Sequence, residues 1–385
     1  MADSSPSARS RLLSLDVFRG ATIAGMVMVN NPGDWGHIYA PWRHSAWDGW
    51  TYTDTVFPFF LWIVGVAMMF SFAKRIERGE DKGKLAMHIL RRSIIIFALG
   101  LFIAGFPFGM AFGEKFSFAT LRIPGVLQRI AICYFIAGTL VLNFSTRVQI
   151  GITFSLLALY WILVKTVNVP GFGIGIWTPT GNLAWYIDSH LLKGHTWTGA
   201  PVPGFDPEGV LSTLPAIATT MFGVFTGLFL RTERSREEKA GWMFVTGSVL
   251  MLLGVIADHW LPINKNMWTS SYAVFMAGLA LNVLASLYWI IDVKGRSSWT
   301  KPFAIFGLNA ITVYVLSELV AELGWFIKVS GPDGKVISLQ EWYYQGLFAH
   351  LANPMNASFL HSVAFILVMY LIAYGMYKMK WVIKA

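Results

Sequence analysis

The sequence predicts an all-α membrane protein, a bundle of about ten transmembrane helices. Of its 385 residues, 55% are hydrophobic and only 13% are charged, whereas soluble domains average about 25% charged residues. The apolar residues occur in runs long enough to cross a bilayer, and most Lys and Arg lie between them. The net charge of +9 therefore fits membrane topology and not a nucleic-acid partner. Membrane lipids are the expected surroundings.

Ten segments are predicted to span the membrane, because a helix needs about 20 mainly apolar residues to cross the hydrocarbon core. They are 12–31, 55–73, 90–109, 124–143, 147–166, 210–230, 241–258, 268–291, 302–322 and 358–378. Trp342–Leu351 is too short to span, which leaves open an eleventh, re-entrant or interfacial element. Residues 1–11 are expected to form a short polar tail, and 12–385 a single membrane domain.

The basic residues predict the orientation. Ten spans place both termini on one side, and 21 of the 30 Lys and Arg fall on that side. Because short loops rich in Lys and Arg stay in the cytoplasm, both termini are predicted to be cytoplasmic. The loop between the first two spans and the long loops 166–209 and 322–354 then face away from the cytoplasm. The single cysteine, Cys133, excludes an intrachain disulfide.

The loop between the first two spans carries the strongest candidate for chemistry. It places His44 beside Arg43 and close to Trp47 and Asp48. Histidine is suited to proton transfer or nucleophilic attack near neutral pH, although an ordinary surface histidine is the alternative. The closely spaced histidine pairs of the chain lack nearby acidic ligands, so no metal site is predicted.

Two charged residues lie inside the first predicted span. Asp16 and Arg19 are three residues apart and so share a face of the helix. They either neutralise each other near the cytoplasmic end or line a path for a substrate or cofactor. Asn30 ends the same helix, about 20 Å from Asp16 at 1.5 Å per residue. One helix can therefore connect the cytoplasmic side with the His44 loop.

Arginines and a buried glutamate mark two other spans. Arg122 and Arg129 flank the start of the fourth span and are expected on one helix face, two turns apart. There they either bind phosphate or carboxylate or anchor the chain to lipid headgroups. The ninth span is interrupted by Asn309, Tyr314 and Glu318, the last two of which share a face. A buried glutamate needs a partner, and either arginine can supply it.

Two loops before later spans hold further polar candidates. Asp206 and Glu208 precede the sixth span, where they either cap that helix or contact a polar substrate. The eighth span opens with a group suited to sugar hydroxyls, or to an interfacial cap with a tryptophan anchor: Asn264, Lys265, Asn266 and Trp268.

Seven sequence blocks, taken in order, resemble the catalytic membrane domain of the heparan-α-glucosaminide N-acetyltransferase family, one of the transmembrane acyltransferases. Each block is weak alone, but together they cover nearly the whole chain and are specific. The blocks are Arg11–Gly20, Met28–Asn30, His44–Gly49 with Asp54–Pro58, Arg122–Arg129, Asp206–Gly209, Asn264–Trp268 and Asn309–Val315.

The resemblance implies transfer of an acetyl group from cytosolic acetyl-CoA, without a metal, to an amino sugar on the far side of the membrane. The family's active histidine falls on His44, and its active-site asparagine on Asn30. Polar and aromatic positions of the blocks are the candidates for substrate or cofactor binding: Asp16, Arg19, Trp47, Asp48, Asp54, Arg122, Gln128, Arg129, Asp206, Glu208, Asn264, Lys265, Asn266, Trp268, Asn309, Tyr314 and Glu318.

The resemblance also suggests a cellular setting. Only about ten polar residues precede the first span, where animal members carry an extended luminal region. The chain therefore resembles a bacterial member, expected in the inner membrane with the His44 loop in the periplasm. A cell-envelope or scavenged amino sugar is the expected acceptor, and a homodimer is left open.

Two mechanisms and two rival functions follow from the same residues. His44 either deprotonates the acceptor while acetyl-CoA is bound, which is favoured, or is itself acetylated first. Asn30 can donate a hydrogen bond to the thioester oxygen. The rivals are transport of a sugar or lipid-linked intermediate and O-acetylation of a sugar. Candidates for holding the CoA phosphates on the cytoplasmic side are Lys74, Arg75, Arg91 and Arg92.

Overall fold

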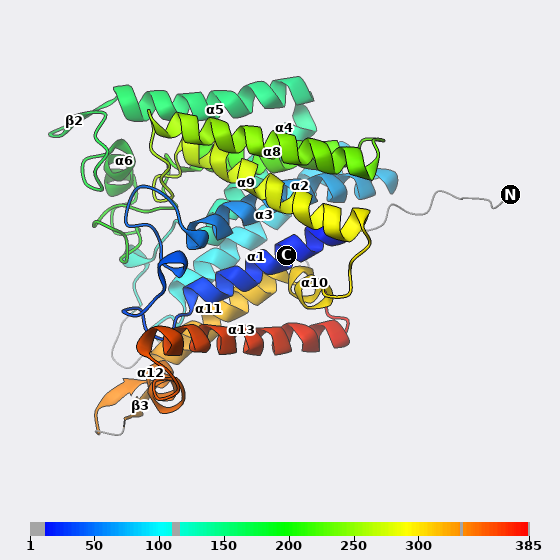
Figure 1. The fold of residues 1–385 in the computed structure, drawn as a ribbon. Coiled ribbons are helices and arrows are strands. Elements are labelled where there is room, and N and C mark those ends of the chain that lie inside the picture. Colours follow the sequence, from blue (N-terminus) through cyan, green and yellow to red (C-terminus); the bar gives the residue numbers. More distant parts are fainter. Residues whose placement is uncertain (1–11, 110–115, 332–333, 384–385) are drawn as a thin grey trace.

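The computed structural model describes residues 12–109, 116–331 and 334–383, so the predicted tail 1–11 lies outside the described residues. Long helices run side by side through the molecule, most of them roughly along one direction (Figure 1). The helices are α1 (Leu13–Asn30), α2 (Tyr52–Glu77), α3 (Lys82–Gly105), α4 (Val126–Asn143), α5 (Thr146–Thr166), α6 (Leu183–Leu191), α7 (Thr213–Leu230), α8 (Arg236–Asp258), α9 (Ser270–Tyr288), α10 (Lys301–Leu308), α11 (Ala310–Phe326), α12 (Leu339–Tyr343) and α13 (Pro354–Lys378).

Among the described residues, eight helices are long and apolar enough to cross a membrane. A ninth candidate is the pair α10 and α11, which is bent by 82° at Asn309. The prediction of one straight span over 302–322 is therefore wrong in shape. The predicted first span is α1, an 18-residue helix that carries Asp16 and Arg19 and is not one of the eight. The all-α, multi-pass membrane fold is confirmed.

Several helices begin before the apolar run that predicted them. The α3 helix begins at Lys82 instead of residue 90, with the Asp81 side chain accepting a hydrogen bond from the Lys84 N–H. The α8 helix begins at Arg236, where Ser235 caps it in the same way. Such caps satisfy backbone N–H groups at a helix start, so the polar first turns continue the membrane helices outward.

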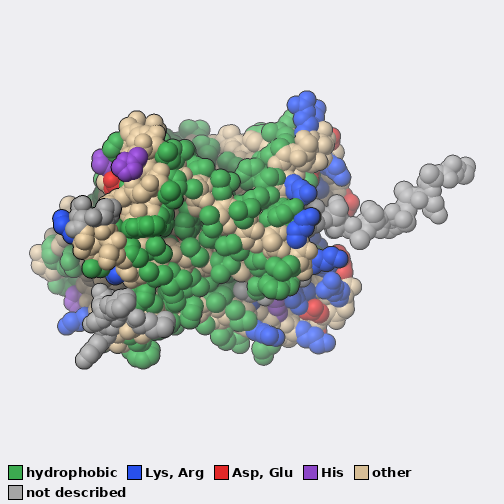
Figure 2. Space-filling view, turned by 90° about the horizontal axis from the view of Figure 1, so that it is seen from below, with side chains coloured by type: hydrophobic (Ala, Val, Ile, Leu, Met, Phe, Trp, Pro, Cys, Tyr) green, Lys and Arg blue, Asp and Glu red, His purple; other side chains and the backbone are tan. Residues whose placement is uncertain are grey.

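The two ends of the bundle differ in chemistry. We call the end where α1 begins and α13 ends the basic end. Lys and Arg gather there, and the more prominent histidines lie at the opposite end (Figure 2). We call that opposite end the loop end, because the long connections 31–51, 167–212 and 327–353 lie there (Figure 1).

The loop end carries most of the short elements of the described chain. They are the 3-10 turns η1 (Ala40–Trp42) and η2 (Phe118–Thr120), the hairpins β1 (Asn168–Val169) with β2 (Gly173–Ile174) and β3 (Lys328–Ser330) with β4 (Val336–Ser338), and the π-turn η4 (Tyr344–Phe348). The predicted short element Trp342–Leu351 corresponds to the end of α12 and η4. A second π-turn, η3 (Trp289–Val293), extends α9 at the basic end.

The α2 and α7 helices form the centre of the bundle. In the most apolar stretches of these two helices, 78% and 72% of the residues are buried. The corresponding share is only 22–28% for α3, α5, α8 and α13, which expose apolar side chains outward. A Cβ atom added at Gly65 or Gly223 would fall about 2 Å from a backbone oxygen of the opposite helix. Only glycine permits this close backbone contact. The α2 helix is thus fixed in place and connects the loop end with the basic end.

Candidate active site

A histidine–aspartate pair lies at the loop end, where α2 begins. The His44 Nδ1 atom is 2.5 Å from Asp54 Oδ1. Asp54 is 1% exposed, whereas the His44 side chain is 50% exposed. A carboxylate only accepts hydrogen bonds, so Nδ1 carries a proton, and in the neutral imidazole Nε2 is the atom with the lone pair. The pair therefore presents a basic nitrogen to the space outside α2.

Local sequence explains why Asp54 is held in this position. Asp54 is the third residue of α2 and forms a capping box with Thr51, whose backbone N–H and hydroxyl both donate to Asp54 Oδ2. The Ser45 N–H donates to the same oxygen. The buried Tyr272 hydroxyl donates to the backbone oxygen of Asp54 at 2.5 Å. One carboxylate thus caps a helix and orients the imidazole.

The rest of the His44 loop is fastened to distant segments. Asp48 accepts hydrogen bonds from the Trp177 indole (2.8 Å) and from Asn264 Nδ2 (3.1 Å). The Trp47 indole donates to the backbone oxygen of Trp177. Gly49, in the left-handed region at φ +87°, bridges to Asn264. Three predicted candidates, Trp47, Asp48 and Asn264, therefore shape the loop around His44.

A second charged cluster joins Arg122 to the loop before α7. The Arg122 guanidinium contacts Asp206 at 2.7 and 2.9 Å and Glu208 at 2.5 Å. Burial opposes the charge on Glu208, but the positive charges of Arg122, Lys265 and Arg129 together lower the pKa of Glu208 to about 2. The same carboxylates raise the pKa of Arg122 further despite its burial. Asp206 and Glu208 do not cap α7, so that expectation is wrong.

Arg129 has a different environment from Arg122. Because α4 begins at Val126, Arg122 precedes the helix and the two arginines do not share a helix face, contrary to the prediction. Arg129 is 1% exposed and donates to the Gly209 carbonyl and to Ser212 Oγ. It lies over the ring of Trp268, which is fully buried and not an interfacial anchor.

Asn30, at the last turn of α1, is hydrogen-bonded to α11. Its Nδ2 atom donates to Glu318 Oε1 at 3.1 Å. The predicted arginine partner of Glu318 is therefore wrong, and Asn30 takes that role. The neighbouring Asn31 carbonyl contacts His361 and Ser362 of α13, which fixes the end of α1.

Electrostatic interactions of Lys265 and Tyr314 connect the carboxylates of these clusters. Lys265 interacts electrostatically with both Asp54 and Glu208. Tyr314 does so with Glu208 and Glu318. The structure thus groups most predicted candidates around one region of the loop end, with His44 and Asn30 in it.

Other candidates lie elsewhere. Arg19 pairs with Asp16 at 2.7 Å and donates to the Gly307 carbonyl at the basic end. Asn309 binds the backbone of the C-terminal segment there. Gln128 is buried against Gly100 and Gly125, and Asn266 is half-buried in the turn before α9.

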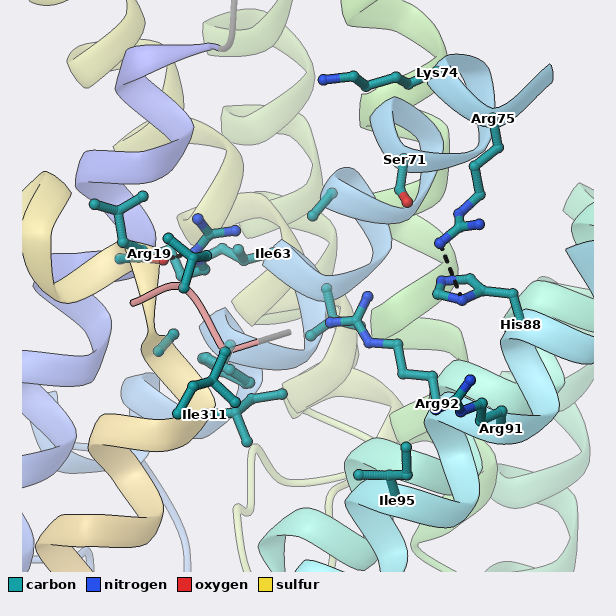
Figure 3. A pocket seen from close by; sticks show the side chains of 18 of the residues that line it. Arg19, Ile63, Ser71, Lys74, Arg75, His88, Arg91, Arg92, Ile95 and Ile311 are labelled. Carbon is teal, nitrogen blue, oxygen red and sulfur yellow. Dashed lines mark hydrogen bonds between the residues drawn. The ribbon is translucent and has the colours of Figure 1, made fainter. Parts of the chain in front are cut away.

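A cavity of about 680 Å³ opens at the basic end (Figure 3). One side is basic and includes the four residues predicted to hold CoA phosphates. Arg75 donates to His88 Nδ1 at 3.2 Å, so this imidazole is an acceptor at that atom. The buried Arg92 Nε has no hydrogen-bond partner within the part of the chain that the structure describes. The basic lining residues are Arg19, Lys74, Arg75, Arg78, His88, Arg91 and Arg92.

The cavity extends deep along α2 toward the histidine. Its lining residues on that helix run from Arg75 to Phe60, which is about 23 Å at 1.5 Å per residue. From Phe60 to Asp54 only about 9 Å remain along the same helix. Around Phe60 the walls are apolar, with Ile63 and Ile311. The shape fits a ligand with an anionic head and a long, less polar arm.

Some residues of the site were not predicted. The Thr51–Asp54 spacing matches a capping box, so the sequence could have predicted the role of Thr51 at the start of α2. Trp177 contacts Asp48 of the loop, and Tyr272 contacts the backbone of Asp54, both across long sequence separations that no sequence pattern indicated. Asp188, on α6, is buried and accepts a hydrogen bond from the Val210 N–H at 3.0 Å. Its burial raises its pKa to about 7.

The fold and the site define an integral membrane protein with a histidine–aspartate pair at one end and a basic cavity at the other. Residues 11–264 match the family model described as "Heparan-alpha-glucosaminide N-acetyltransferase, catalytic". The chain is 32% identical over 363 residues to heparan-alpha-glucosaminide N-acetyltransferase of Mus musculus, covering 82% of this chain and 54% of the mouse protein. The Homo sapiens enzyme is 30% identical over 358 residues, covering 80% and 53%.

The chain therefore belongs to the heparan-alpha-glucosaminide N-acetyltransferase family, as its sequence blocks predicted. It spans about half the length of these curated relatives.

Proposed function

We propose that the protein transfers the acetyl group of acetyl-CoA, bound at the basic end, to the amine of a glucosamine-like sugar at the loop end. The names of the relatives describe an N-acetyltransferase acting on a glucosaminide. The observation that carries the proposal is the basic cavity, whose lining on α2 runs to within about 9 Å of Asp54 along the helix.

The basic end supports donor binding. CoA carries phosphates, which guanidinium groups bind well in bidentate geometry. Arg92 and Lys74 face the interior of the cavity from two helices (Figure 3). The apolar depth around Ile63 suits the pantetheine arm, whose thioester then points toward His44. The excess of Lys and Arg at this end favours a cytoplasmic location for it, and so a periplasmic location for His44 if the host is a bacterium.

His44 supplies the base. Its Nε2 takes a proton from the sugar ammonium, and the resulting amine attacks the thioester carbonyl. The C–S bond then breaks, and the CoA thiolate leaves as the thiol by taking the second proton from the nitrogen. Asp54 holds the ring and stabilises the imidazolium that forms. The same geometry permits Nε2 to attack the thioester itself, giving an acetyl-histidine that the amine then cleaves. Solvent exposure of His44 favours the direct route, because water competes for an acetyl-histidine.

Asn30 supports the developing charge. One N–H of its Nδ2 is engaged by Glu318, and the second remains to donate to the thioester oxygen as it becomes an oxyanion. Lys265 and Asn266 lie on the loop that also contacts the His44 loop through Asn264. Their position on this loop supports a role as hydrogen-bonding partners of the sugar hydroxyls.

A direct assay tests the proposal. Purified protein is incubated with acetyl-CoA labelled in the acetyl group and with glucosamine, alongside His44→Ala. We expect base-stable N-acetylglucosamine from the wild type only. Label bound to wild-type protein without acceptor would indicate the acetyl-histidine route, and a base-labile product would indicate O-acetylation. A wild type that consumes no acetyl-CoA with a panel of amino sugars would contradict the proposal and favour a transporter.

A further inference from the structure

We propose that the C-terminal segment Trp381–Ile383 is part of the donor site, where Val382 and Ile383 bind the pantetheine arm and Asn309 positions them. This inference rests on the proposed acetyl-CoA donor. It assigns a binding role to a segment outside the seven sequence blocks and a positioning role to Asn309.

The segment leaves α13 and folds back into the bundle. Asn309, at the break between α10 and α11, holds it with two hydrogen bonds of 2.9 Å. Its Nδ2 donates to the Trp381 carbonyl, and its Oδ1 accepts from the Ile383 N–H. A side-chain amide can satisfy a donor and an acceptor of an extended backbone at once. Asn309 lies outside both helices, at the 82° bend between α10 and α11. Its side-chain amide there hydrogen-bonds to the C-terminal segment.

Val382 and Ile383 both line the cavity. They are 47% and 54% exposed, so much of their apolar surface is left uncovered by the protein. Figure 3 shows the C-terminal ribbon, reddish as in Figure 1, crossing the cavity on the side of Arg19 and Ile311, across from Arg75 and Arg92. The cavity thus has a wall rich in arginine and, facing it, a mainly apolar wall that also includes Arg19.

The two walls match the two parts of one ligand. The phosphates of CoA need the basic wall, and its pantetheine arm, with a dimethyl group and a methylene chain, gains by covering apolar side chains. Three adjoining elements complete the apolar side: α2 with Ile63 and Val64, α11 with Ile311, and the segment itself. Without the segment this wall would lack Val382 and Ile383.

The test uses a chain ending at Lys380, and Asn309→Asp in the full chain. Asn309→Asp keeps the acceptor for Ile383 N–H and replaces the donor to Trp381 with a repelling oxygen. Met379→Ala is the control, because Met379 is exposed and does not line the cavity. For each protein, KM for acetyl-CoA, Kd for CoA and Kd for adenosine 3′,5′-bisphosphate are measured, with the Tm as a check on folding.

We expect both variants to raise KM for acetyl-CoA and Kd for CoA about tenfold, which corresponds to about 1.4 kcal/mol. Binding of the bisphosphate, which lacks the pantetheine arm, should change less than twofold, as should every constant for Met379→Ala. Unchanged CoA binding in a folded truncated chain would overturn the inference, and so would tighter binding, which would make the segment an obstruction. Equal weakening of CoA and bisphosphate would also overturn it, because the segment would then support the whole cavity.

Failure of the proposed function gives a different result. A wild type that binds CoA but acetylates no amine contradicts the function, while the comparison of Kd values still decides the role of the segment. A wild type that neither binds CoA nor consumes acetyl-CoA overturns both.

Discussion

His44 and Asp54 are joined by a 2.5 Å contact between Nδ1 and Oδ1, and Asp54 is at the same time the N3 residue that caps α2. The capping geometry fixes the carboxylate on the helix that also lines the basic cavity. The helix that holds the partner of the proposed base, His44, is therefore the same helix that lines the proposed donor site. The predictions below test each part of this arrangement.

The first prediction concerns the pair itself. Asp54→Asn should lower kcat about 10³-fold, because an amide favours the wrong imidazole tautomer and cannot stabilise imidazolium. His44→Ala should lower kcat at least as far, and the double variant should be no worse than His44→Ala alone. The measurements are initial rates and the Kd for CoA for the wild type, both single variants and the double variant. Losses that simply multiply, or a loss of CoA binding, would show that the two residues do not act as a unit.

Asn30 and Glu318 form the second test. Asn30→Ala should lower kcat about 10²-fold with KM for acetyl-CoA nearly unchanged, since its N–H acts on charge that develops in the transition state. Glu318→Gln keeps a hydrogen bond to Asn30 and should cost less than tenfold. The split between kcat and KM is the measurement, and a rise in KM alone would argue against oxyanion stabilisation.

Arg92 provides a test of the donor cavity. Arg92→Gln should raise KM for acetyl-CoA about tenfold by removing a charge next to phosphate, with KM for the sugar unchanged. Arg147→Gln, at the same end of the bundle but outside the cavity, is the matched control. Equal effects of the two substitutions would indicate a general surface charge effect and not a phosphate site.

Asp188 gives a pH prediction for stability. Its pKa is raised from 3.8 to about 7 by burial, with a further contribution from nearby Asp206. Between about pH 4 and 7 the folded state therefore keeps a proton that the unfolded state has lost, so stability falls as pH rises through this window. Asp188→Asn stays neutral and should have a flatter dependence of Tm on pH between 5 and 8. Parallel curves for the two proteins would contradict the assignment.

Sequence patterns predicted the membrane fold because hydropathy is summed over twenty residues and tolerates single polar positions. The same averaging concealed the break at Asn309, which counts as one polar residue in an apolar run. The contact of Asp48 with Asn264 joins segments 216 residues apart, and no local pattern specifies such pairs. Headgroup anchoring was one of the two alternatives for Arg129. It is buried instead by Ser212, just before α7, and Trp268, just before α9, which are far from it in the sequence.

Acetyl transfer from one end of the bundle to the other is the central claim, and sided proteoliposomes test it most directly. Labelled acetyl-CoA, which does not cross bilayers, is added outside vesicles that contain glucosamine inside. We predict labelled N-acetylglucosamine within the lumen for the wild type and none for His44→Ala. Product formed only when both substrates are on the same side would contradict the account.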